Sequence, residues 1–420
     1  MKKNKLPKFV VLDHINKAAL IDPDAGVFLG VSKKILNNLE TEEVQNILYP
    51  IWQKQVEIQR KIASYHEGIN TLYLMITRRC NMNCAFCAIN ANDLTCKQYE
   101  LTISDIYEKV IPFIKECKPH KFILTGGEPL IKDNIVDIVN ILHEEVDTHI
   151  TLQSNGIAIS KKIIEELKGN IQEIDFSTKH MFGEKGNEET LRYNIEQCIS
   201  AGIEVVLSFV YEKSNRNELY KVIDIAAEYN TGLLVNIIAP VGRAKEKSEF
   251  LSDIEKFHMN LDIAQYIYDK GYEKKPLCNV LSSSISVRKA CGGYGKVIAI
   301  FPEGNVYMCQ CLENNTYRIG NVLNDTPQKI GRTLYEKMED ITIKKAFCVE
   351  LKEVCSDCMY RYFCTGKCPV SVEKENYTCY FIKKIIDYEL FYKNSESPRE
   401  ALKEYIEYVK NCIRDYPNGE

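Results

Sequence analysis

The segment TLYLMITRRCNMNCAFCAIN, residues 71–90, joins a strand-like run to three closely spaced cysteines. Its first seven residues, 71–77, form a short and mostly apolar run that predicts a buried β-strand. Cys80, Cys84 and Cys87 follow within eight positions. When strands of this kind lie parallel in a sheet, functional residues gather at their carboxyl ends. The segment therefore predicts the first strand of a parallel sheet and the place of its functional site.

Runs of the same kind recur downstream, and amphipathic helical patterns separate them. We expect strands at 71–77, 121–126, 149–156, 173–178, 204–210 and 232–240. We expect helices at 103–118, 134–146, 161–169, 191–202 and 217–229. Short apolar runs separated by helices predict parallel strands joined by right-handed crossovers. The predicted fold class is α/β, with a partial (β/α)6 TIM-like barrel over residues 71–250.

The flanks of this barrel differ from it in pattern. Residues 1–70 predict a small N-terminal α+β module, with short strands between residues 8 and 30 followed by helices. Past the barrel, residues 251–290 predict a linker that bridges to the next domain. Cysteines crowd residues 291–385, which predict a cysteine-rich domain, and residues 386–420 are expected to be helical.

The composition excludes several classes of protein. The chain has 420 residues, a net charge of −4 and no apolar run that approaches the length of a membrane span. Its Lys and Arg residues are scattered, so nucleic acid is not expected as a partner. Neither a membrane nor secretion is expected, because the N-terminus lacks a signal-peptide pattern. We expect a cytoplasmic protein, in which the 17 cysteines stay reduced and clustered thiols serve metals or catalysis.

Three cysteines are one fewer than a closed metal site needs. Structural zinc takes four protein ligands, and a 4Fe–4S cubane has four irons to bind. Three thiolates therefore leave one iron open. That iron can take a substrate or a cofactor as its ligand.

The run CNMNCAFC, residues 80–87, resembles the CxxxCxxC signature of the radical S-adenosylmethionine (SAM) enzymes, with aromatic Phe86 before the last cysteine. This resemblance implies that Cys80, Cys84 and Cys87 hold a 4Fe–4S cluster whose open iron binds SAM. It implies further that one electron cleaves SAM to a 5'-deoxyadenosyl radical, which abstracts a hydrogen atom from the substrate. Phe86 is then expected to lie near the adenine of the cofactor.

TGGEP, residues 125–129 at the end of the second predicted strand, is similar to the GGEP motif of the same family. By itself this run also fits a glycine turn between a strand and a helix. The resemblance implies that Gly126 and Gly127 let the backbone approach the ammonium group of SAM closely. It implies that Glu128 accepts a hydrogen bond from that charged donor.

Further SAM contacts are expected at the ends of later strands. The resemblance places Ser154, Asn155 and Ser177 beside the ribose and carboxylate of SAM. Asn155 with the glycine after it also fits a simple turn. After Ser177 the chain departs from the family's frequent Ser-x-Asp-Gly, so nothing beyond Ser177 is carried over. Arg243, in the segment APVGRA at 239–244, is expected to meet the carboxylate of SAM or to lie on the surface.

Seven cysteines of the cysteine-rich region form a second pattern, with Gly304 five residues before the second of them. They are Cys291, Cys309, Cys355, Cys358, Cys364, Cys368 and Cys379. Cys355 and Cys358, separated by two residues, form a knuckle whose thiolates converge on one metal centre. Cys364 and Cys379 can complete that centre, which leaves Cys368 free to join Cys291 and Cys309. The pattern resembles the SPASM domain of some radical SAM enzymes, which implies two auxiliary 4Fe–4S clusters and three clusters in all.

The group of Cys291, Cys309 and Cys368 lacks a fourth cysteine. Several relatives supply one about six residues after the first ligand, but this chain has Val297 there. Cys278, Cys311 or Cys348 can fill the place, or an iron stays open. Cys311 is the nearest candidate, because it follows Cys309 by two residues and is expected on the same strand face. Zinc is an alternative metal for these cysteines, since thiolate sites suit both metals.

These resemblances together imply a peptide-modifying enzyme. Relatives with a SPASM domain mostly modify peptides or proteins. The N-terminal module resembles, in topology, the winged-helix-like element that captures a leader peptide as an added strand, and a plain packing subdomain is the alternative. We therefore expect a maturase that forms a thioether, as in sactipeptides, or another side-chain crosslink in a ribosomally synthesised precursor peptide. Its expected partners are that peptide and an electron donor such as flavodoxin or ferredoxin.

Two further interpretations stay open. One is a sulfatase-maturing enzyme that forms formylglycine, or a small-molecule radical SAM oxidoreductase. The other is a zinc-stabilised binding scaffold without chemistry. No catalytic residue is assigned beyond the cofactor and cluster ligands, because general bases in this family have no fixed spacing.

Overall fold

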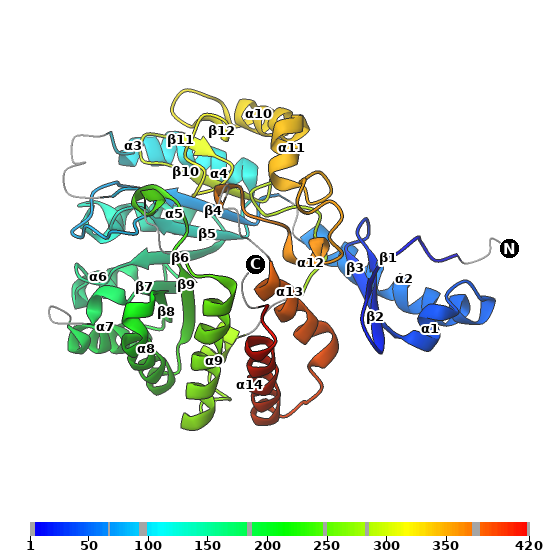
Figure 1. The fold of residues 1–420 in the computed structure, drawn as a ribbon. Helices are drawn as coiled ribbons and strands as arrows, with labels where there is room; N and C mark the ends of the chain where they lie inside the picture. The colour runs from blue at the N-terminus through cyan, green and yellow to red at the C-terminus, as the bar shows by residue number, and fades with distance from the viewer. Residues whose placement is uncertain are drawn as a thin grey trace.

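A computed structural model describes most of the chain, in which two β-sheets and their helices are placed (Figure 1). The described residues are 5–65, 68–91, 99–182, 187–246, 250–281, 285–371 and 379–417. The larger sheet has the strand order β12-β11-β10-β4-β5-β6-β7-β8-β9. Its parallel barrel strands are β4 (Thr71–Met75), β5 (Lys121–Thr125), β6 (His149–Ser154), β7 (Glu173–Ser177), β8 (Glu204–Tyr211) and β9 (Gly232–Ile237). The predicted α/β class with a partial barrel is confirmed.

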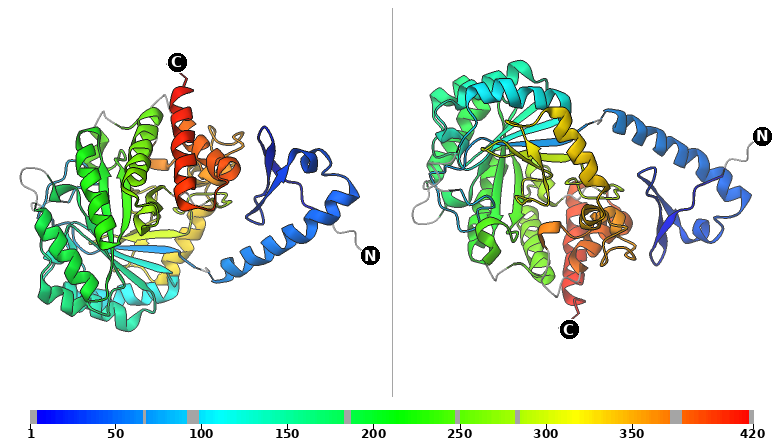
Figure 2. Two further views of the ribbon diagram at one scale, coloured as in Figure 1. Left: turned by 90° about the horizontal axis from the view of Figure 1, so that it is seen from below. Right: turned by 90° about the horizontal axis from the view of Figure 1, so that it is seen from above.

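Helices cover the outer face of this sheet (Figures 1 and 2). They are α3 (Ile103–Asp105), η2 (Ile106–Val110), α4 (Ile111–Cys117), α5 (Ile135–Glu145), α6 (Lys161–Leu167), α7 (Glu188–Ser200) and α8 (Arg216–Tyr229). Along β8, outward residues such as Leu207 and Phe209 are fully buried against the helices. Inward residues such as Ser208 and Val210 are only half-buried. The barrel therefore encloses a hollow lumen rather than a packed core.

Short 3-10 helices follow several strands at the carboxyl end of the barrel. They are η3 (Pro129–Ile131), η4 (Lys179–Met181), η5 (Lys213–Asn215) and η6 (Gly242–Glu246). Because parallel strands end at the same edge, these turns and the loop after β4 lie at one mouth of the barrel.

The cysteine-rich region is joined to the barrel by sheet pairing. Strand β10 (Val297–Ile300) runs parallel to β4, with Val297 opposite Thr71 and Ile300 opposite Leu74. β10 turns back into β11 (Asn305–Tyr307), and β12 (Arg318–Asn321) completes the sheet. The pairing of β10 with β4 joins segments far apart in the chain, so no local pattern predicts it. The hairpin extends the barrel sheet beyond β4 (Figure 1).

Helices fill the region after the barrel and the end of the chain. They are α9 (Asp253–Lys270), η7 (Pro276–Leu281), α10 (Pro327–Glu339), α11 (Ile341–Phe347), α12 (Arg361–Cys364), η8 (Pro369–Ser371), α13 (Tyr380–Asp387), η9 (Tyr388–Tyr392) and α14 (Pro398–Arg414). A capping box of Ser252 and Glu255 starts α9, and Gly271 in the left-handed region ends it. The bridging region thus holds a long helix, which packs against α14.

The N-terminal module is an antiparallel sheet of β1 (Val10–Asp13), β2 (Lys17–Asp22) and β3 (Val27–Ser32), followed by α1 (Lys33–Asn37) and α2 (Glu42–Tyr65). One face of the sheet packs on the first turns of α2. The other face packs on the cysteine-rich region, where Leu12 and Ile21 share a cluster with Phe363 and Phe391. The module stands to one side of the barrel (Figure 2).

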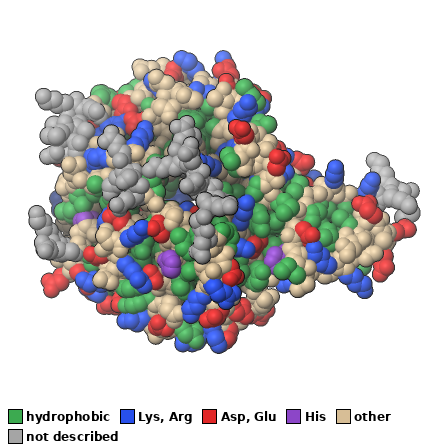
Figure 3. Space-filling view, viewed as in Figure 1, with side chains coloured by type: hydrophobic (Ala, Val, Ile, Leu, Met, Phe, Trp, Pro, Cys, Tyr) green, Lys and Arg blue, Asp and Glu red, His purple; other side chains and the backbone are tan. Residues whose placement is uncertain are grey.

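Charged side chains of both signs are interspersed over the face seen in Figure 3. Within the described residues, no helix combines the length and the apolar character that crossing a bilayer demands.

Candidate active site

One cavity at the mouth of the barrel, of about 550 Å³, collects the residues that the sequence singled out. Its lining includes Cys80, Cys84, Phe86, Cys87, Gly126, Gly127, Glu128, Ser154, Asn155, Ser177 and Arg243. These residues come from four strand ends and from the segment after β9. The parallel order of the strands brings them together, as expected for a site at the carboxyl ends of a barrel.

The glycines of the second motif allow it to pack on the cysteine loop. A Cβ on Gly127 would lie 1.9 Å from the carbonyl oxygen of Arg79. A Cβ on Gly126, whose φ is +142°, would lie 2.5 Å from the carbonyl oxygen of Thr77. The Gly127 amide donates to that Thr77 oxygen at 2.7 Å, and the Glu128 amide donates to the Arg79 oxygen at 2.9 Å. Any side chain at either glycine would separate the two loops.

The carboxylate of Glu128 is buried and accepts three hydrogen bonds. The donors are the Leu130 amide at 3.0 Å, the Ser154 hydroxyl at 2.8 Å and the Asn155 amide at 2.7 Å. Burial raises the pKa of Glu128, and these hydrogen bonds oppose the rise. Because a carboxylate has about four acceptor positions, one position remains for a donor in the cavity. Glu128 thus ties the end of β5 to the end of β6.

Two other carried-over residues hold the cysteine loop itself. The Asn155 amide nitrogen Nδ2 donates to Asn81 Oδ1 at 2.7 Å. Arg243 Nε donates to the carbonyl oxygen of Cys84 at 2.7 Å, and its Nη2 donates to that of Ala91 at 2.9 Å. The Arg243 backbone amide donates to the Cys87 carbonyl at 3.0 Å. The structure therefore uses Arg243 as a brace for the loop, in addition to placing it in the cavity wall.

A buried ion network anchors the base of the loop. Glu100 accepts from Arg79 Nε at 2.9 Å, from Lys132 Nζ at 3.1 Å and from the Thr77 hydroxyl. Burial would raise the pKa of Glu100, but the hydrogen bonds from Arg79, Thr77 and Lys132 outweigh it and lower the pKa to about 2. The carboxylate therefore stays charged over the physiological pH range.

Two residues just beyond Ser177, where the carry-over stopped, also line the cavity. Lys179 Nζ lies 4.5 Å from the centre of the Phe86 ring and pairs with Glu212. His180 lines the cavity, and its Nε2 is buried without a partner among the described residues. Burial lowers the pKa of His180, so the ring is neutral at pH 7. Sequence reasoning missed Lys179 because the family pattern no longer applies there.

The thiols of the loop suit a metal rather than free nucleophiles. Burial raises the pKa of Cys80 to about 11 and also raises that of Cys84. Such thiols stay protonated at neutral pH until a metal displaces the proton. No three His, Cys, Asp or Glu side chains in the described part of the chain are arranged to hold a single ion. A cubane spreads its thiolates over different irons, so the donor set fits a cluster better than mononuclear zinc.

Comparison with known proteins agrees with this donor set. Residues 74–226 match the family model of the Radical SAM superfamily. The chain contains a radical SAM domain. The matched residues contain the cysteine loop, the glycine motif and the ends of β6 and β7.

The similarity to known proteins extends beyond the radical SAM domain, in both sequence and structure. A GTP 3',8-cyclase of Clostridium perfringens (strain 13 / Type A) is 27% identical over 315 residues, which cover 67% of this chain and 94% of that protein. Native anSMEcpe with bound AdoMet has a TM-score of 0.55 and 16% identity, over 82% of this chain and 98% of that one. Streptococcus suis SuiB has a TM-score of 0.54 and 13% identity, over 94% of this chain and 97% of that one. At these identities the structural likeness shows the fold alone.

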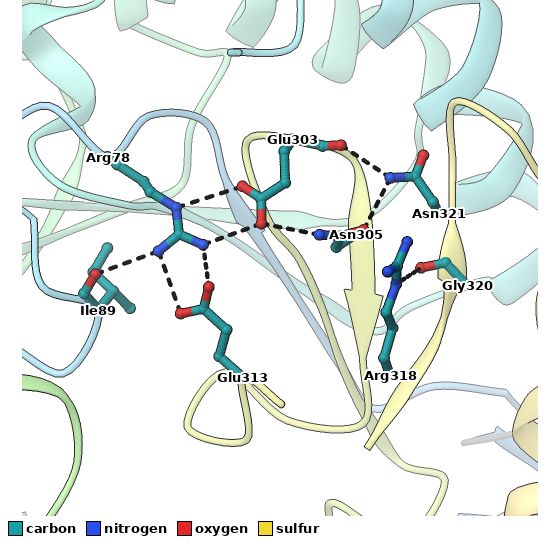
Figure 4. Close-up of polar contacts among 8 residues, drawn as sticks. All are labelled: Arg78, Ile89, Glu303, Asn305, Glu313, Arg318, Gly320 and Asn321. Carbon is teal, nitrogen blue, oxygen red and sulfur yellow. Dashed lines mark hydrogen bonds and ion pairs between the residues drawn. The ribbon is translucent and has the colours of Figure 1, made fainter. Parts of the chain in front are cut away.

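Arg78 connects the loop of the radical SAM domain to the cysteine-rich region (Figure 4). Its guanidinium donates to Glu303 at 3.1 and 3.4 Å and to Glu313 at 3.3 Å, with a second, closer contact to Glu313. It also donates to the carbonyl oxygen of Ile89 at 3.4 Å and lies 5.0 Å from the centre of the Phe301 ring. The Arg78 side chain is 11% exposed. This clamp joins the segment after β4 to the segment after β11.

The structure brings the expected second cysteine group together near this clamp. Cys291, Cys309 and Cys368 are close enough for their charges to interact. The thiols of Cys309 and Cys311 are close enough to interact, which raises the pKa of Cys309, and the Cys309 thiol donates to Gln310 Oε1 at 3.2 Å. Cys311 lies in a turn after β11, with the Leu312 amide donating to the Cys309 carbonyl at 3.1 Å, so the expected strand geometry is wrong although the thiols do meet.

The other two candidates for the fourth ligand have different neighbours. Cys278 donates to the carbonyl oxygen of Tyr272 at 3.1 Å. Cys348 contacts the hydroxyl of Tyr294, and burial raises the pKa of its thiol. Among the described cysteines, Cys311 is therefore the one that meets the second group.

The knuckle group also assembles. Burial raises the pKa of Cys364, and the charges of Cys358 and Cys355 raise it further. Cys379 interacts in the same way with Cys364 and Cys355, and burial raises its pKa to about 11. Buried Lys352 lies between the two groups and donates to the carbonyl oxygen of Lys367 at 2.5 Å. Burial lowers the pKa of Lys352, while thiolates of both groups favour its charged form. This cation offsets the negative charge that thiolates and clusters bring to a buried site.

Proposed function

We propose that the protein is a radical SAM maturase that crosslinks a ribosomally synthesised precursor peptide, through a thioether or another side-chain bond. The observation that carries the proposal is that one of the two cysteine groups lies against the barrel wall, where Cys309 and Cys311 are close enough to Tyr73 of β4 for their charges to interact. β10 and Arg78 fix the segment of Cys309 and Cys311 against the segment that holds Cys80. An enzyme that removes two hydrogens from a peptide needs an electron acceptor near the radical, and auxiliary clusters there would supply one.

The residues at the mouth of the barrel would hold a cluster and leave one of its irons open to the cavity. Cys80, Cys84 and Cys87 would hold a 4Fe–4S cluster with one open iron, which binds SAM and supplies radical chemistry on reduction. Glu128 and Arg243 keep the loops in place, so that Phe86 and the end of β7 face the same cavity. The GGEP and η6 segments pack directly on the loop.

The electron would pass through the cysteine-rich region. The two cysteine groups would hold two auxiliary clusters, with Cys311 as fourth ligand of the group that contains Cys309. We expect a cytoplasmic enzyme that takes its electron from a flavodoxin or a ferredoxin, because free thiols and iron–sulfur clusters require a reducing compartment.

The N-terminal module supports a peptide as the substrate. SuiB, whose fold covers 94% of this chain, has also been solved bound to a precursor peptide, SuiA. In the module, β1 and β3 are the edge strands of the small sheet. An extended leader can pair with such an edge through main-chain hydrogen bonds. We propose that the module holds the leader while the core of the peptide reaches the barrel.

A small-molecule cyclase is the second candidate, because a GTP 3',8-cyclase matches 67% of the chain. A triphosphate needs free cations or amide nests. The cationic side chains among the described residues lining the cavity are Lys179 and Arg243, and both are engaged, with Glu212 and with loop carbonyls. This arrangement favours the peptide over GTP.

The test uses the full chain, reconstituted with iron and sulfide without oxygen. It is reduced in the presence of SAM and of the product of a short cysteine-rich reading frame beside its gene. A peptide lighter by two hydrogens supports the proposal, and a Cys80→Ala protein prepared in parallel should leave the mass unchanged. Consumption of GTP with an unchanged peptide would establish the cyclase instead.

A further inference from the structure

Asp175 is a buried carboxylate inside the barrel that none of the assignments above uses. It lies on β7 between outward-facing Ile174 and Phe176, and its side chain lines the cavity that contains the cysteine loop. The residue is 6% exposed. Its Oδ2 accepts a hydrogen bond from Gln153 Nε2 at 3.1 Å. Its Oδ1 has no partner among the described residues.

Glu173, on the same strand and the same face, provides a direct contrast. Its carboxylate accepts from Lys121 Nζ at 3.0 Å and from the Thr151 hydroxyl at 3.0 Å. Glu173 thus belongs to a paired network at the base of the barrel. Asp175, two residues closer to the mouth, has one neutral partner and an open oxygen.

The surroundings of Asp175 disfavour its charge. Burial raises its pKa to about 6, with a further contribution from Glu173, while Gln153 and Lys121 oppose the rise. Tyr73 on β4 is the other titratable group close to it. An unpaired carboxylate oxygen in a buried site destabilises a fold. Because buried polar atoms are nearly always satisfied, this oxygen calls for a ligand.

The position of Asp175 indicates which ligand it meets. Along β7 it lies two residues below Ser177, which places it roughly 6.5 Å deeper in the barrel. The lumen around it is polar, since Ser208 accepts from Asn236 Nδ2 at 3.0 Å. Tyr73 is close enough to Cys309, Cys311 and Asp175 for their charges to interact, and burial followed by these neighbours raises its pKa to about 12. Asp175 therefore faces the space below the cofactor contacts, on the side of the cysteine-rich region.

We propose that Asp175 is a substrate-binding carboxylate, whose free oxygen accepts a hydrogen bond from an N–H or O–H group of the peptide residue inserted into the barrel. The assignment rests on the proposed peptide maturase. A guanine base presents N–H donors as well, but the engaged state of Lys179 and Arg243 leaves no cation in the described lining for its phosphates. The contact would hold the reacting residue beside the radical.

Two matched variants test the proposal, Asp175→Asn and Glu173→Gln, each removing one carboxylate from the same face of β7. Three quantities are compared with the unmodified protein: 5'-deoxyadenosine formed from SAM without peptide, the peptide's Kd, and the melting temperature at pH 8. For D175N we expect the formation of 5'-deoxyadenosine without peptide to stay within about twofold of that of the unmodified protein. We expect its Kd for the peptide to rise about tenfold or more, since hydrogen bonds to charged groups are strong. We expect its melting temperature to rise, by roughly 2 °C.

The matched variant should behave in the opposite way. E173Q breaks a satisfied ion pair, so its melting temperature should fall while its Kd for the peptide stays within about twofold. A carboxylate whose loss strengthens the fold and weakens peptide binding is retained for binding.

Each contrary result identifies what has failed. If D175N loses substrate-free SAM cleavage, Asp175 contacts the cofactor and the proposal is overturned. If D175N binds and modifies the peptide normally, the assignment of Asp175 alone is overturned. If the unmodified protein neither binds nor modifies the peptide, the proposed function fails and this proposal fails with it. If D175N loses GTP consumption instead, the ligand is a nucleotide and the peptide assignment is wrong.

Discussion

The cysteine loop of the barrel and the cysteines of the tail hold their thiols in different settings. The barrel loop is bonded by the glycine motif, by Arg243 and by the pair of Arg79 and Glu100. In the cysteine-rich region, Cys355 and Cys358 lie in a segment of turns and Cys364 lies in the four-residue helix α12. Cys368 is exposed. The protein alone sets the shape of the first site. We expect the second to depend on a bound metal for its rigidity, as small thiolate sites commonly do.

The strongest test of this contrast removes one thiol from the barrel loop. Cys84→Ala should abolish SAM cleavage and lower bound iron from about 12 to about 8 atoms per chain, because the tail groups assemble independently. Iron analysis together with assay of 5'-deoxyadenosine measures both effects. Cys198→Ala, which removes a fully buried thiol on α7, is the control and should keep all the iron. Loss of most of the iron in C84A would mean that the sites are not independent.

The next test removes the metal, which should affect the two regions differently. In chelator-treated protein we expect the amides of residues 355–368 to exchange with deuterium much faster, because thiolate–metal bonds are the main constraint there. Amides of β5 to β8 should keep their protection, since apolar burial on the outer face supports those strands. Hydrogen exchange read by mass spectrometry shows both. Uniform loss of protection would contradict the contrast.

The Arg78 side chain links the cysteine loop to the cysteine-rich region, so its removal should destabilise both. Arg78→Ala leaves the carboxylates of Glu303 and Glu313 without their shared partner, at an expected loss of about 2–4 kcal/mol in the free energy of unfolding. Arg78→Lys keeps the charge but not the two-pronged geometry, and should recover part of the loss. Denaturant titration of reconstituted protein measures the difference. Equal stability of R78A and the unmodified protein would show that the clamp is not used.

The smallest expected effect concerns Asp175, which lies between the two regions. Its pKa is raised from 3.8 to about 6, so the folded protein holds this proton more tightly than the unfolded chain. The stability that Asp175 contributes is therefore present below about pH 4 and is lost as the pH rises through about 6. D175N should match the unmodified protein near pH 4 and exceed it by up to about 3 kcal/mol above pH 7. Melting curves of the two proteins across that pH range test this prediction. A difference in stability that is the same at every pH would contradict it.

Local patterns predicted most of the barrel, because apolar runs and amphipathic helices carry a period that one segment displays by itself. The resemblance to the radical SAM family singled out the residues that meet at the barrel mouth, and parallel strands bring their loops to one edge. The pairing of β10 with β4 was missed, because no local signal names a partner more than two hundred positions away. Arg78 was missed for the same reason, as its partners lie 225 and 235 positions along the chain.

Two further misses have different causes. Asp175 lies in the run EIDFST, which predicts an ordinary strand, and only the packed structure shows which face it takes and that one oxygen is open. Cys311 was expected on the face of a strand that in fact ends at Tyr307, and the thiols meet through a turn instead. An acidic residue between two apolar residues of the strand, Ile174 and Phe176, was the one signal that pointed to the first of these.

The central claim is that Cys80, Cys84 and Cys87 hold a 4Fe–4S cluster with one open iron. The most direct measurement reduces the reconstituted protein with SAM and without any substrate, and follows 5'-deoxyadenosine by mass spectrometry. We predict its formation by the unmodified protein and its absence in Cys80→Ala. A colourless protein that carries zinc and leaves SAM intact would contradict the account.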